Sequence, residues 1–286
     1  MKTTKNIAAS VRARLLDRAR QDRVDFNLML TRYALERMLY RLSTSEWSNA
    51  FLLKGALLFD LWFDEPHRPT RDIDLLGFGS AGMDDLTTVF QGVCTQPCDD
   101  GLVFDPESVR AVEIRKDANY EGVRVTLRGT LDGARCAIQV DIGYGDAVTP
   151  AAENVRFPVV LDDMPQPVLR AYPVYTVVAE KYHAIVKLGA ANTRMKDYFD
   201  LWVLARHAAI DHAILQDAID ATFKRRDTPV PQDEPFGLSI DFAAEKMKQQ
   251  QWNAFLSKSK LSAPSLVEVV ELLNQFLIVA GQDQAT

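Results

Sequence analysis

Cysteine and histidine are scarce in this sequence, which holds three cysteines and four histidines in 286 residues. An odd number of cysteines does not suit a disulfide framework, and Cys94 and Cys98 lack the second Cys or His pair that a zinc site requires. The histidines have no metal-ligand spacing, and no Ser/His/Asp or Cys/His arrangement stands out. We therefore expect three reduced, structural cysteines, counting Cys136, and nothing indicates a zinc centre or a nucleophilic triad.

Long apolar runs are missing as well. No run approaches the ~20 residues of a membrane span, and the first five residues lack the apolar stretch of a signal peptide. These absences predict a cytoplasmic protein with no membrane partner. The chain is 47% apolar, so it can still bury a core large enough for one large domain or two modest ones.

Positive charge is in short supply overall but is concentrated at one end. The net charge is −6, yet residues 1–41 hold ten Lys/Arg against four acids, which gives +6 there and −12 for the rest. The balance argues against a protein that coats nucleic acid non-specifically. The basic segment could meet phosphates, or it could be the solvated side of amphipathic helices, and both can be true.

Apolar periodicity and turn signals predict a mixed order of helices and strands. Ser10 and Asp25 are plausible N-caps for the first two helices. The apolar run 50–62 passes through Gly55 and predicts a short turn followed by a helix. Helices are predicted at 8–23, 25–42, 83–95, 177–188, 195–208, 211–225, 242–257 and 266–279, and strands at 72–76, 108–114, 122–127 and 134–144, with turns at 117–119 and 131–133.

Five prolines between residues 148 and 174 indicate a boundary. We therefore divide the chain into basic N-terminal helices at 1–50 that pack on the core, an α/β core at 51–150, and a mainly helical C-terminal domain at 151–286. The fold class is α/β (α+β), and neither internal repeats nor low-complexity segments are present.

The most informative residues for function are Asp72 and Asp74. In an extended segment the two side chains point to one face, while Ile73 and Leu75 point into a core. Two carboxylates this close repel each other unless a positive charge lies between them, and hard oxygen ligands suit Mg²⁺ or Mn²⁺. The pattern predicts a divalent-metal site for phosphoryl or nucleotidyl transfer.

A third carboxylate, Asp141, has the opposite parity to the apolar side chains of its predicted strand. Alone, it is best interpreted as a strand-end aspartate that faces solvent or caps the following turn. Beside Asp72 and Asp74 it could instead complete a site for two divalent ions, an arrangement that activates an attacking hydroxyl and stabilises a leaving pyrophosphate.

Several residues near these acids could contact phosphate. Gly55, before Ala56, could present backbone N–H groups to a nucleotide, or could serve only close packing of helix and strand. Thr70 shares the parity of Asp72 and could bond a phosphate oxygen or cap the strand. Arg68 and Arg71 could neutralise phosphate, although surface ion pairs are the commoner fate of arginines.

The C-terminal half offers a second group of charged residues. Lys181 lies on the buried stripe of its predicted helix, so its amine either reaches out to water or is aimed at an anion such as a triphosphate. Asp197 in the first turn of the next helix is explained by the helix dipole. Asp200, among apolar neighbours, could orient Lys181 or Arg194 through a charge-assisted bond.

These motifs, in this order, resemble the AbiEii/AbiGii toxin family of nucleotidyltransferases, and the likeness runs over nearly the whole chain. The segments that carry it are 10–16, 33–42, 53–57, 70–76, 140–146, 179–184 and 194–202. The resemblance implies a DNA-polymerase-β-like nucleotidyltransferase core with a mixed sheet. It implies that Asp72 and Asp74 bind the metals, with Asp141 as a further ligand, that Lys181 contacts the triphosphate, and that Asp197 or Asp200 completes the site.

With the resemblance, the expected nucleotide-binding residues are Lys54, Gly55, Thr70, Arg71, Arg194 and Lys196. Relatives of the MenT type add nucleotides to the 3′ acceptor end of tRNA, and a cognate antitoxin opposes them. The implied reaction is thus transfer of NMP from an NTP to RNA with Mg²⁺ or Mn²⁺, in a toxin–antitoxin system with a role in phage defence. The alternatives are a non-catalytic nucleotide- or RNA-binding module of the same fold, and a phosphotransferase acting on a protein or small molecule.

Overall fold

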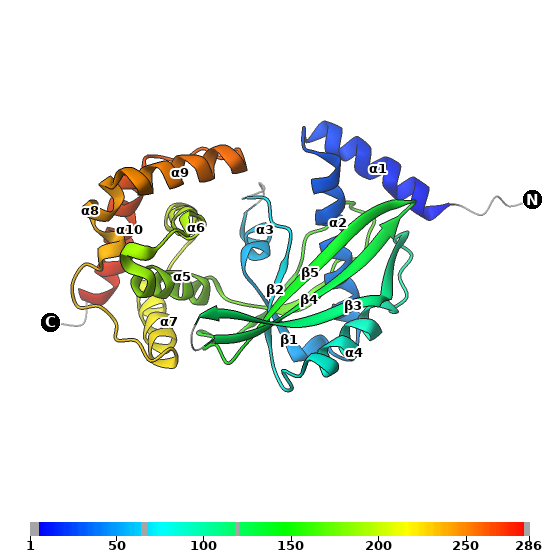
Figure 1. The fold of residues 1–286 in the computed structure, drawn as a ribbon, viewed down its shortest axis with the longest axis horizontal. Coiled ribbons are helices and arrows are strands. Elements are labelled where there is room, and N and C mark those ends of the chain that lie inside the picture. The colour runs from blue at the N-terminus through cyan, green and yellow to red at the C-terminus, as the bar shows by residue number, and fades with distance from the viewer. Residues whose placement is uncertain (1–5, 64–67, 118–119, 283–286) are drawn as a thin grey trace, which may run out of the picture. The chain divides into compact units, whose positions relative to one another are not determined.

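A mixed sheet forms the centre of the first half of the chain (Figure 1). The computed structural model describes residues 6–63, 68–117 and 120–282. Within this part the strand order is β3-β4-β5-β2-β1-β7-β6, with β2 parallel to β5, β1 parallel to β7, and the other pairs antiparallel. The strands are β1 Phe51–Lys54, β2 Ile73–Gly77, β3 Leu102–Asp117, β4 Tyr120–Leu131, β5 Ala134–Tyr144, β6 Glu153–Arg156 and β7 Val168–Ala171. The predicted α/β class with a mixed sheet is confirmed.

Helices occupy most of the remaining chain. The α-helices are α1 Ile7–Gln21, α2 Phe26–Thr44, α3 Phe59–Trp62, α4 Met83–Cys94, α5 Val174–Leu188, α6 Met195–His207, α7 His212–Arg225, α8 Ile240–Ala244, α9 Lys246–Ser259 and α10 Leu266–Gln282, and the short 3₁₀ helices are η1 Ser48–Ala50, η2 Ala56–Leu58, η3 Gly189–Ala191 and η4 Phe236–Leu238. No helix in the described ranges is long and apolar enough to cross a membrane.

The helix and strand predictions need three corrections. The side chain of Asn6, not Ser10, caps α1, whereas Asp25 caps α2 as predicted. The run 50–62 begins with the short buried strand β1. The sequence did not predict this strand, because its four residues do not alternate between apolar and polar side chains. The predicted helix 242–257 is broken at Glu245, which separates α8 from α9 with an extended ψ of 127°.

Strands β3, β4 and β5 form a long antiparallel meander. In β4 the side chains of Val123, Val125 and Leu127 are buried, whereas those of alternate positions are exposed or half-buried. The turn predicted at 131–133 is present, and Asp132 and Gly133 both have positive φ (45° and 79°), the conformation of a tight hairpin turn. The turn signal at 117–119 includes residues outside the described ranges.

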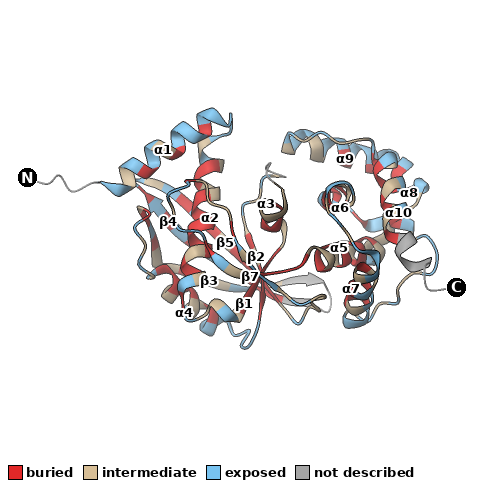
Figure 2. Cartoon of the chain, turned by 180° about the vertical axis from the view of Figure 1, so that it is seen from behind, coloured by how far each residue is buried: buried red, intermediate tan, exposed pale blue. Residues whose placement is uncertain are grey.

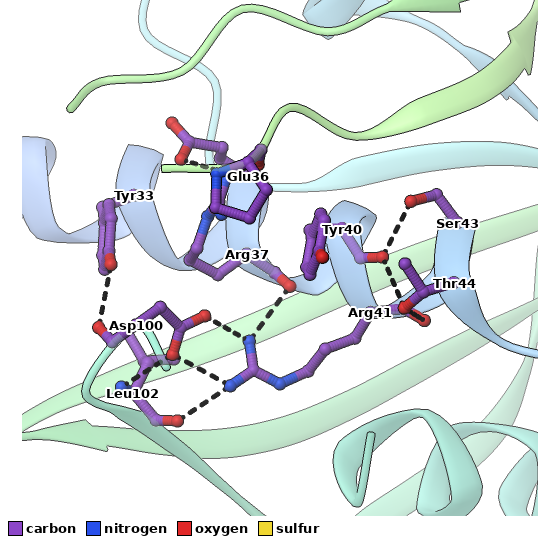
Figure 3. Close-up of polar contacts among 10 residues, drawn as sticks. Tyr33, Glu36, Arg37, Tyr40, Arg41, Ser43, Thr44, Asp100 and Leu102 are labelled. Carbon is purple, nitrogen blue, oxygen red and sulfur yellow. Dashed lines mark hydrogen bonds and ion pairs between the residues drawn. The ribbon is translucent and has the colours of Figure 1, made fainter. Parts of the chain in front are cut away.

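Charged groups are buried where α2 meets the start of β3 (Figure 3). The Arg41 guanidinium donates to both carboxylate oxygens of Asp100, at 2.6 and 3.0 Å, and to the Leu102 carbonyl at 2.9 Å. Glu36 lies 2.7 Å from Arg37 and accepts from the backbone N–H of Val160, but burial outweighs these contacts and raises its pKa to about 7. The buried charges of α2 are therefore structural.

Most arginines of the basic N-terminal segment also form ion pairs. Five further arginines of residues 1–41 pair with acids: Arg12 with Asp132, Arg14 with Asp163, Arg18 with Asp22, Arg20 with Asp17 and Arg32 with Asp60. Three of these five partners, together with Asp100, lie outside residues 1–41, so part of the surplus positive charge is matched by carboxylates from elsewhere in the fold, and the interpretation as a phosphate-facing surface gains no support from it.

The chain forms two compact units, each with its own buried residues (Figure 2). Unit 1 comprises Met1–Gly145 and Glu153–Ala171, so the N-terminal helices and strands β6 and β7 belong with the central sheet. Unit 2 comprises Asp146–Ala152 and Tyr172–Thr286 and is helical apart from its connections. The proline-rich stretch predicted as a boundary holds the crossings between the units, and it also contains the two short strands.

Candidate active site

Four charged residues of unit 1 form one row across neighbouring strands. Lys54 of β1 is opposite Asp74 of β2, Asp74 is opposite Asp141 of β5, and Asp141 is opposite Arg124 of β4. Directly opposite residues of neighbouring strands point to the same face of a sheet. The row therefore places two carboxylates side by side between two cations.

Asp72 adds a carboxylate just before the first residue of β2. It is two residues from Asp74, which puts it on the same side of an extended chain. Its Oδ1 accepts a hydrogen bond from Thr70 Oγ1 at 2.8 Å. Thr70 thus holds the Asp72 carboxylate, and its predicted contact with phosphate stays a prediction. Both Asp72 and Asp74 are half-buried, so they keep some contact with solvent.

Gly55 is required by its contact with Asp74. A Cβ atom built on Gly55 would lie 2.2 Å from Asp74 Oδ2, and the glycine has a φ of +79° that L-residues rarely adopt. The backbone after β1 therefore packs directly against the Asp74 carboxylate. The sequence predicted a turn and then a helix at Gly55, and the short helices η2 and α3 follow it without a break.

Arg124 is a site residue that the sequence analysis missed. Its Nε and Nη2 donate to Oδ1 and Oδ2 of Asp141 at 2.8 and 2.9 Å, a bidentate ion pair. The pKa of Arg124 is raised chiefly by this hydrogen bond; burial opposes the rise, and the negative charges of Asp141, Asp72 and Asp74 add to it. The charges of all three carboxylates thus act on the same guanidinium.

The signal for Arg124 was present but incomplete. Alternation in the predicted strand 122–127 puts Arg124 on the polar face, yet only the hairpin register shows which residue of the next strand lies opposite. Asp141 itself is 5% exposed and is further approached by Gln139 Nε2 at 3.4 Å. Asp141 therefore does not face solvent; it forms a buried ion pair with Arg124, and its role as a third metal ligand stays a prediction.

The donor set of this region suits a hard divalent cation at Asp72 and Asp74. Both groups are carboxylates on one side of β2, half-buried, and Thr70 holds one while Gly55 is packed against the other. Within the described residues no group of three His, Cys, Asp or Glu side chains is arranged to hold a metal ion. Asp72 and Asp74 thus supply two carboxylates for a metal ion, whereas the Asp141 carboxylate is bound by the guanidinium of Arg124.

Unit 2 holds the second predicted group in a closed cluster. Lys181 Nζ of α5 donates to Asp197 Oδ1 at 2.9 Å and to Asp200 Oδ2 at 2.6 Å, both on α6. The two carboxylates are 1% and 0% exposed, and the Lys181 side chain is 13% exposed. The contact between Asp200 and Lys181 that the sequence favoured is present.

Arg194 joins this cluster from its solvent side. Its Nε lies 2.6 Å from Asp197 Oδ2, and about half of its side chain remains exposed. Burial alone would raise the pKa of Asp197, but the charges of Lys181 and Arg194 outweigh burial, so the pKa is lowered. Lys196 is exposed on α6 and lies outside these ion pairs. Asp197 is therefore held by two cations and does more than complement a helix dipole.

The predicted site residues thus fall into two groups. Lys54, Gly55, Thr70, Asp72, Asp74 and Asp141 gather at the ends of β1 and β2 and on β5, in unit 1. Lys181, Arg194, Asp197 and Asp200 gather between α5 and α6, in unit 2. Arg71 is exposed directly before Asp72 and lines a separate pocket of unit 1.

Comparisons with known proteins agree with this arrangement of elements. Residues 37–275 match the family described as nucleotidyl transferase AbiEii toxin, type IV TA system. Two solved structures share the fold at 15% sequence identity and a TM-score of 0.50. A candidate nucleotidyltransferase of H. pylori covers 90% of this chain and 96% of its own, and JHP933 of Helicobacter pylori covers 88% and 91%. No curated protein matches the chain.

Proposed function

This chain belongs to the AbiEii family of nucleotidyl transferase toxins of type IV toxin–antitoxin systems, and from that premise we propose that it transfers a nucleoside monophosphate from an NTP to an RNA hydroxyl. The proposed acceptor is the 3′ end of tRNA, the leaving group is pyrophosphate, and the metal is Mg²⁺ or Mn²⁺. The family implies an antitoxin as partner.

The observation that carries the proposal is the pair Asp72 and Asp74, half-buried on one side of β2 beside Gly55. These two carboxylates would hold the divalent cation, which when bound lowers the pKa of the attacking hydroxyl and stabilises charge on the phosphates. Thr70 fixes the orientation of Asp72 through its 2.8 Å hydrogen bond. The cross-strand register and the contact with Gly55 fix Asp74.

The flanking cations have separate proposed tasks. Arg124 balances the charge of Asp141, so that fewer uncompensated negative charges oppose the approach of an anionic nucleotide. Lys54, across from Asp74, would add positive charge at the other end of the row. Lys181 is proposed to contact the triphosphate on the strength of the family resemblance, and its carboxylate partners Asp197 and Asp200 would position it.

The proposal is tested by incubating the purified protein with Mg²⁺, total RNA and each α-³²P-labelled NTP in turn, and separating the RNA on a denaturing gel. We expect label in tRNA-sized bands with the wild type, none with Asp72→Asn, and full labelling with the matched control Asp99→Asn, an exposed acid of the same unit. Omission of RNA or metal is expected to abolish the label.

Two results would contradict the proposal. If label moves only from γ-³²P-NTP, and to a protein or small molecule, the protein is a phosphotransferase, because nucleotidyl transfer moves only the α-phosphate. If no label moves while nucleotide binds equally with and without Mg²⁺, the protein is a binding module that keeps the fold without turnover.

A further inference from the structure

We propose that unit 1 carries a binding site for the phosphates of a ribonucleic acid strand, in a pocket next to the acidic row, and this inference rests on the proposed function. The pocket has a volume of about 650 Å³ and receives Arg71, Arg110, Arg128 and Arg135 from four different segments. We call these four residues and the cavity between them the arginine pocket.

Sheet geometry explains why a pocket forms here. Pairing between β2 and β5 begins at Ile73 opposite Val140, so residues 134–139 of β5 extend beyond β2. Over that length β5 has β4 on one side, and the other side has no strand among the described residues. The first turns of α2, with Asn27 and Thr31, close the pocket near this free edge.

The arginine pocket differs from the rest of the protein in its charge. Its lining holds four arginines and no aspartate or glutamate, in a chain whose net charge is −6. Arg71 and Arg135 are exposed, and neither has an ion pair within the described ranges. Arg128 forms an ion pair with Asp105 at 3.2 Å. Arg110 donates hydrogen bonds to the backbone carbonyls of Glu107 and Val109. The arginines of the N-terminal segment, by contrast, mostly have carboxylate partners.

The pocket is continuous with the acidic row along the strands. Going back along β5 from Asp141, the exposed-face residues are Gln139, Ala137 and Arg135, and opposite them on β4 lie Thr126, Arg128 and Thr130. Alternate residues of a strand are about 6.8 Å apart, which is comparable with the separation of neighbouring phosphates in an extended strand. Arg71 directly precedes Asp72, so a chain whose end reaches the carboxylates could pass over these arginines.

The remaining chemistry of the lining favours a nucleic acid backbone. The hydroxyl of Thr126 and the amides of Asn27 and Gln139 can hydrogen-bond phosphate oxygens and 2′-hydroxyls. The lining has no aromatic side chain on which a base could stack. The arginine pocket should therefore hold RNA by its backbone and contribute little to base preference.

The test measures RNA binding without turnover. In an Asp72→Asn background, binding of fluorescently labelled tRNA is followed by anisotropy over a series of salt concentrations. Substitution of Arg110, Arg128 and Arg135 by Gln is expected to weaken binding at least tenfold at low salt. It should also reduce the slope of log K against log salt by about 2, since each phosphate contact of a single strand contributes about 0.7.

The matched control substitutes Arg18, Arg20 and Arg156 by Gln, which removes the same charge from exposed positions of unit 1 outside the pocket. In this control variant the slope of log K for RNA binding against log salt is expected to equal that of the Asp72→Asn parent. The single variant Arg135→Gln guards against a folding defect, because Arg135 is exposed and has no ion pair in the described part of the chain, and it should lower the slope by about 0.7.

Several results would overturn the inference. One is an equal loss of affinity in the pocket triple and the control triple, which would show a general charge effect. Another is equal competition by polyglutamate and by RNA of the same charge, which would assign the pocket to an acidic protein. In proteins that keep Asp72, unchanged labelling of RNA by the pocket triple at limiting RNA would reject the pocket and leave the proposed function intact. If the wild type does not label RNA but the pocket triple still reduces the salt dependence of RNA binding, the proposed function is rejected and the RNA-binding pocket is retained.

Discussion

The two groups of aspartates in this protein differ in what surrounds them. On the sheet, Asp72 and Asp74 are half-buried; Thr70 donates a hydrogen bond to Asp72, and Gly55 and Lys54 lie next to Asp74. In the helical unit, Asp197 and Asp200 are almost fully buried and share the amine of Lys181. Carboxylates that already hold a buried cation are poor ligands for a second one. The buried pair is therefore suited to positioning Lys181, whereas the half-buried pair on the sheet is proposed to bind the divalent cation.

The largest expected effect is on activity, from Asp72→Asn. The substitution keeps the shape of the side chain and removes its charge, so transfer to RNA should fall by about 10³-fold or more. The free energy of unfolding should change by no more than about 0.5 kcal/mol, because the group is not part of a buried ion pair. Initial rates of labelling and urea unfolding measure the two quantities, with Asp99→Asn as control. A large loss of stability would show that Asp72 is a structural acid.

The largest expected effect on stability comes from Lys181→Met. Removal of the amine leaves two buried carboxylates facing each other, which should lower the free energy of unfolding by about 3–5 kcal/mol. The control Lys187→Met removes an exposed lysine of the same helix and should have almost no effect. Asp197→Asn in the Lys181→Met background should restore part of the stability, because the repulsion between the two buried carboxylates is removed. If Lys181→Met is as stable as the wild type, the contrast between the two groups fails.

Sequence periodicity predicted the elements of the two groups better than their contacts. The parity of residues 72–76 predicted correctly that Ile73 and Leu75 are buried on the side away from Asp74. It could not show that Asp74 lies opposite Asp141, since this depends on the pairing of two strands more than sixty residues apart. Arg124 was missed because the register of the hairpin formed by β4 and β5 could not be read from the sequence. Lys181 and Asp200 were matched because the buried stripes of two helices place few charged groups together.

The third prediction concerns the contact between Gly55 and Asp74. In Gly55→Ala the new Cβ would lie 2.2 Å from Asp74 Oδ2, so the carboxylate must move, and activity should fall by about 10²-fold. Gly133→Ala is the matched control, because Gly133 has the same φ of +79° but nothing within 4 Å of the added atom. Both variants should lose about 1–3 kcal/mol of stability from backbone strain, and only Gly55→Ala should lose activity. Equal activity in the two would show that the position of Asp74 is not critical.

The last prediction is a pH dependence, and it has opposite signs for two buried acids. The pKa of Asp197 is lowered, although burial opposes this, because Lys181 and Arg194 stabilise its charged form. Its stabilising contribution is therefore complete above the unfolded-state pKa of about 4 and is lost as pH falls through the folded-state value. The difference in unfolding free energy between wild type and Asp197→Asn should be constant above about pH 5 and shrink below about pH 4.

Glu36 supplies the contrast, since burial beside a single arginine raises its pKa to about 7. Here the folded state binds a proton that the unfolded state has lost, so stability falls as pH rises from about 4.5 to 7, by about 3 kcal/mol in total. Glu36→Gln should remove this loss, and urea unfolding of the three proteins between pH 3 and 8 measures both effects. Curves of the same sign for Asp197 and Glu36 would mean that the number of neighbouring cations does not decide whether a buried carboxylate in this protein is charged.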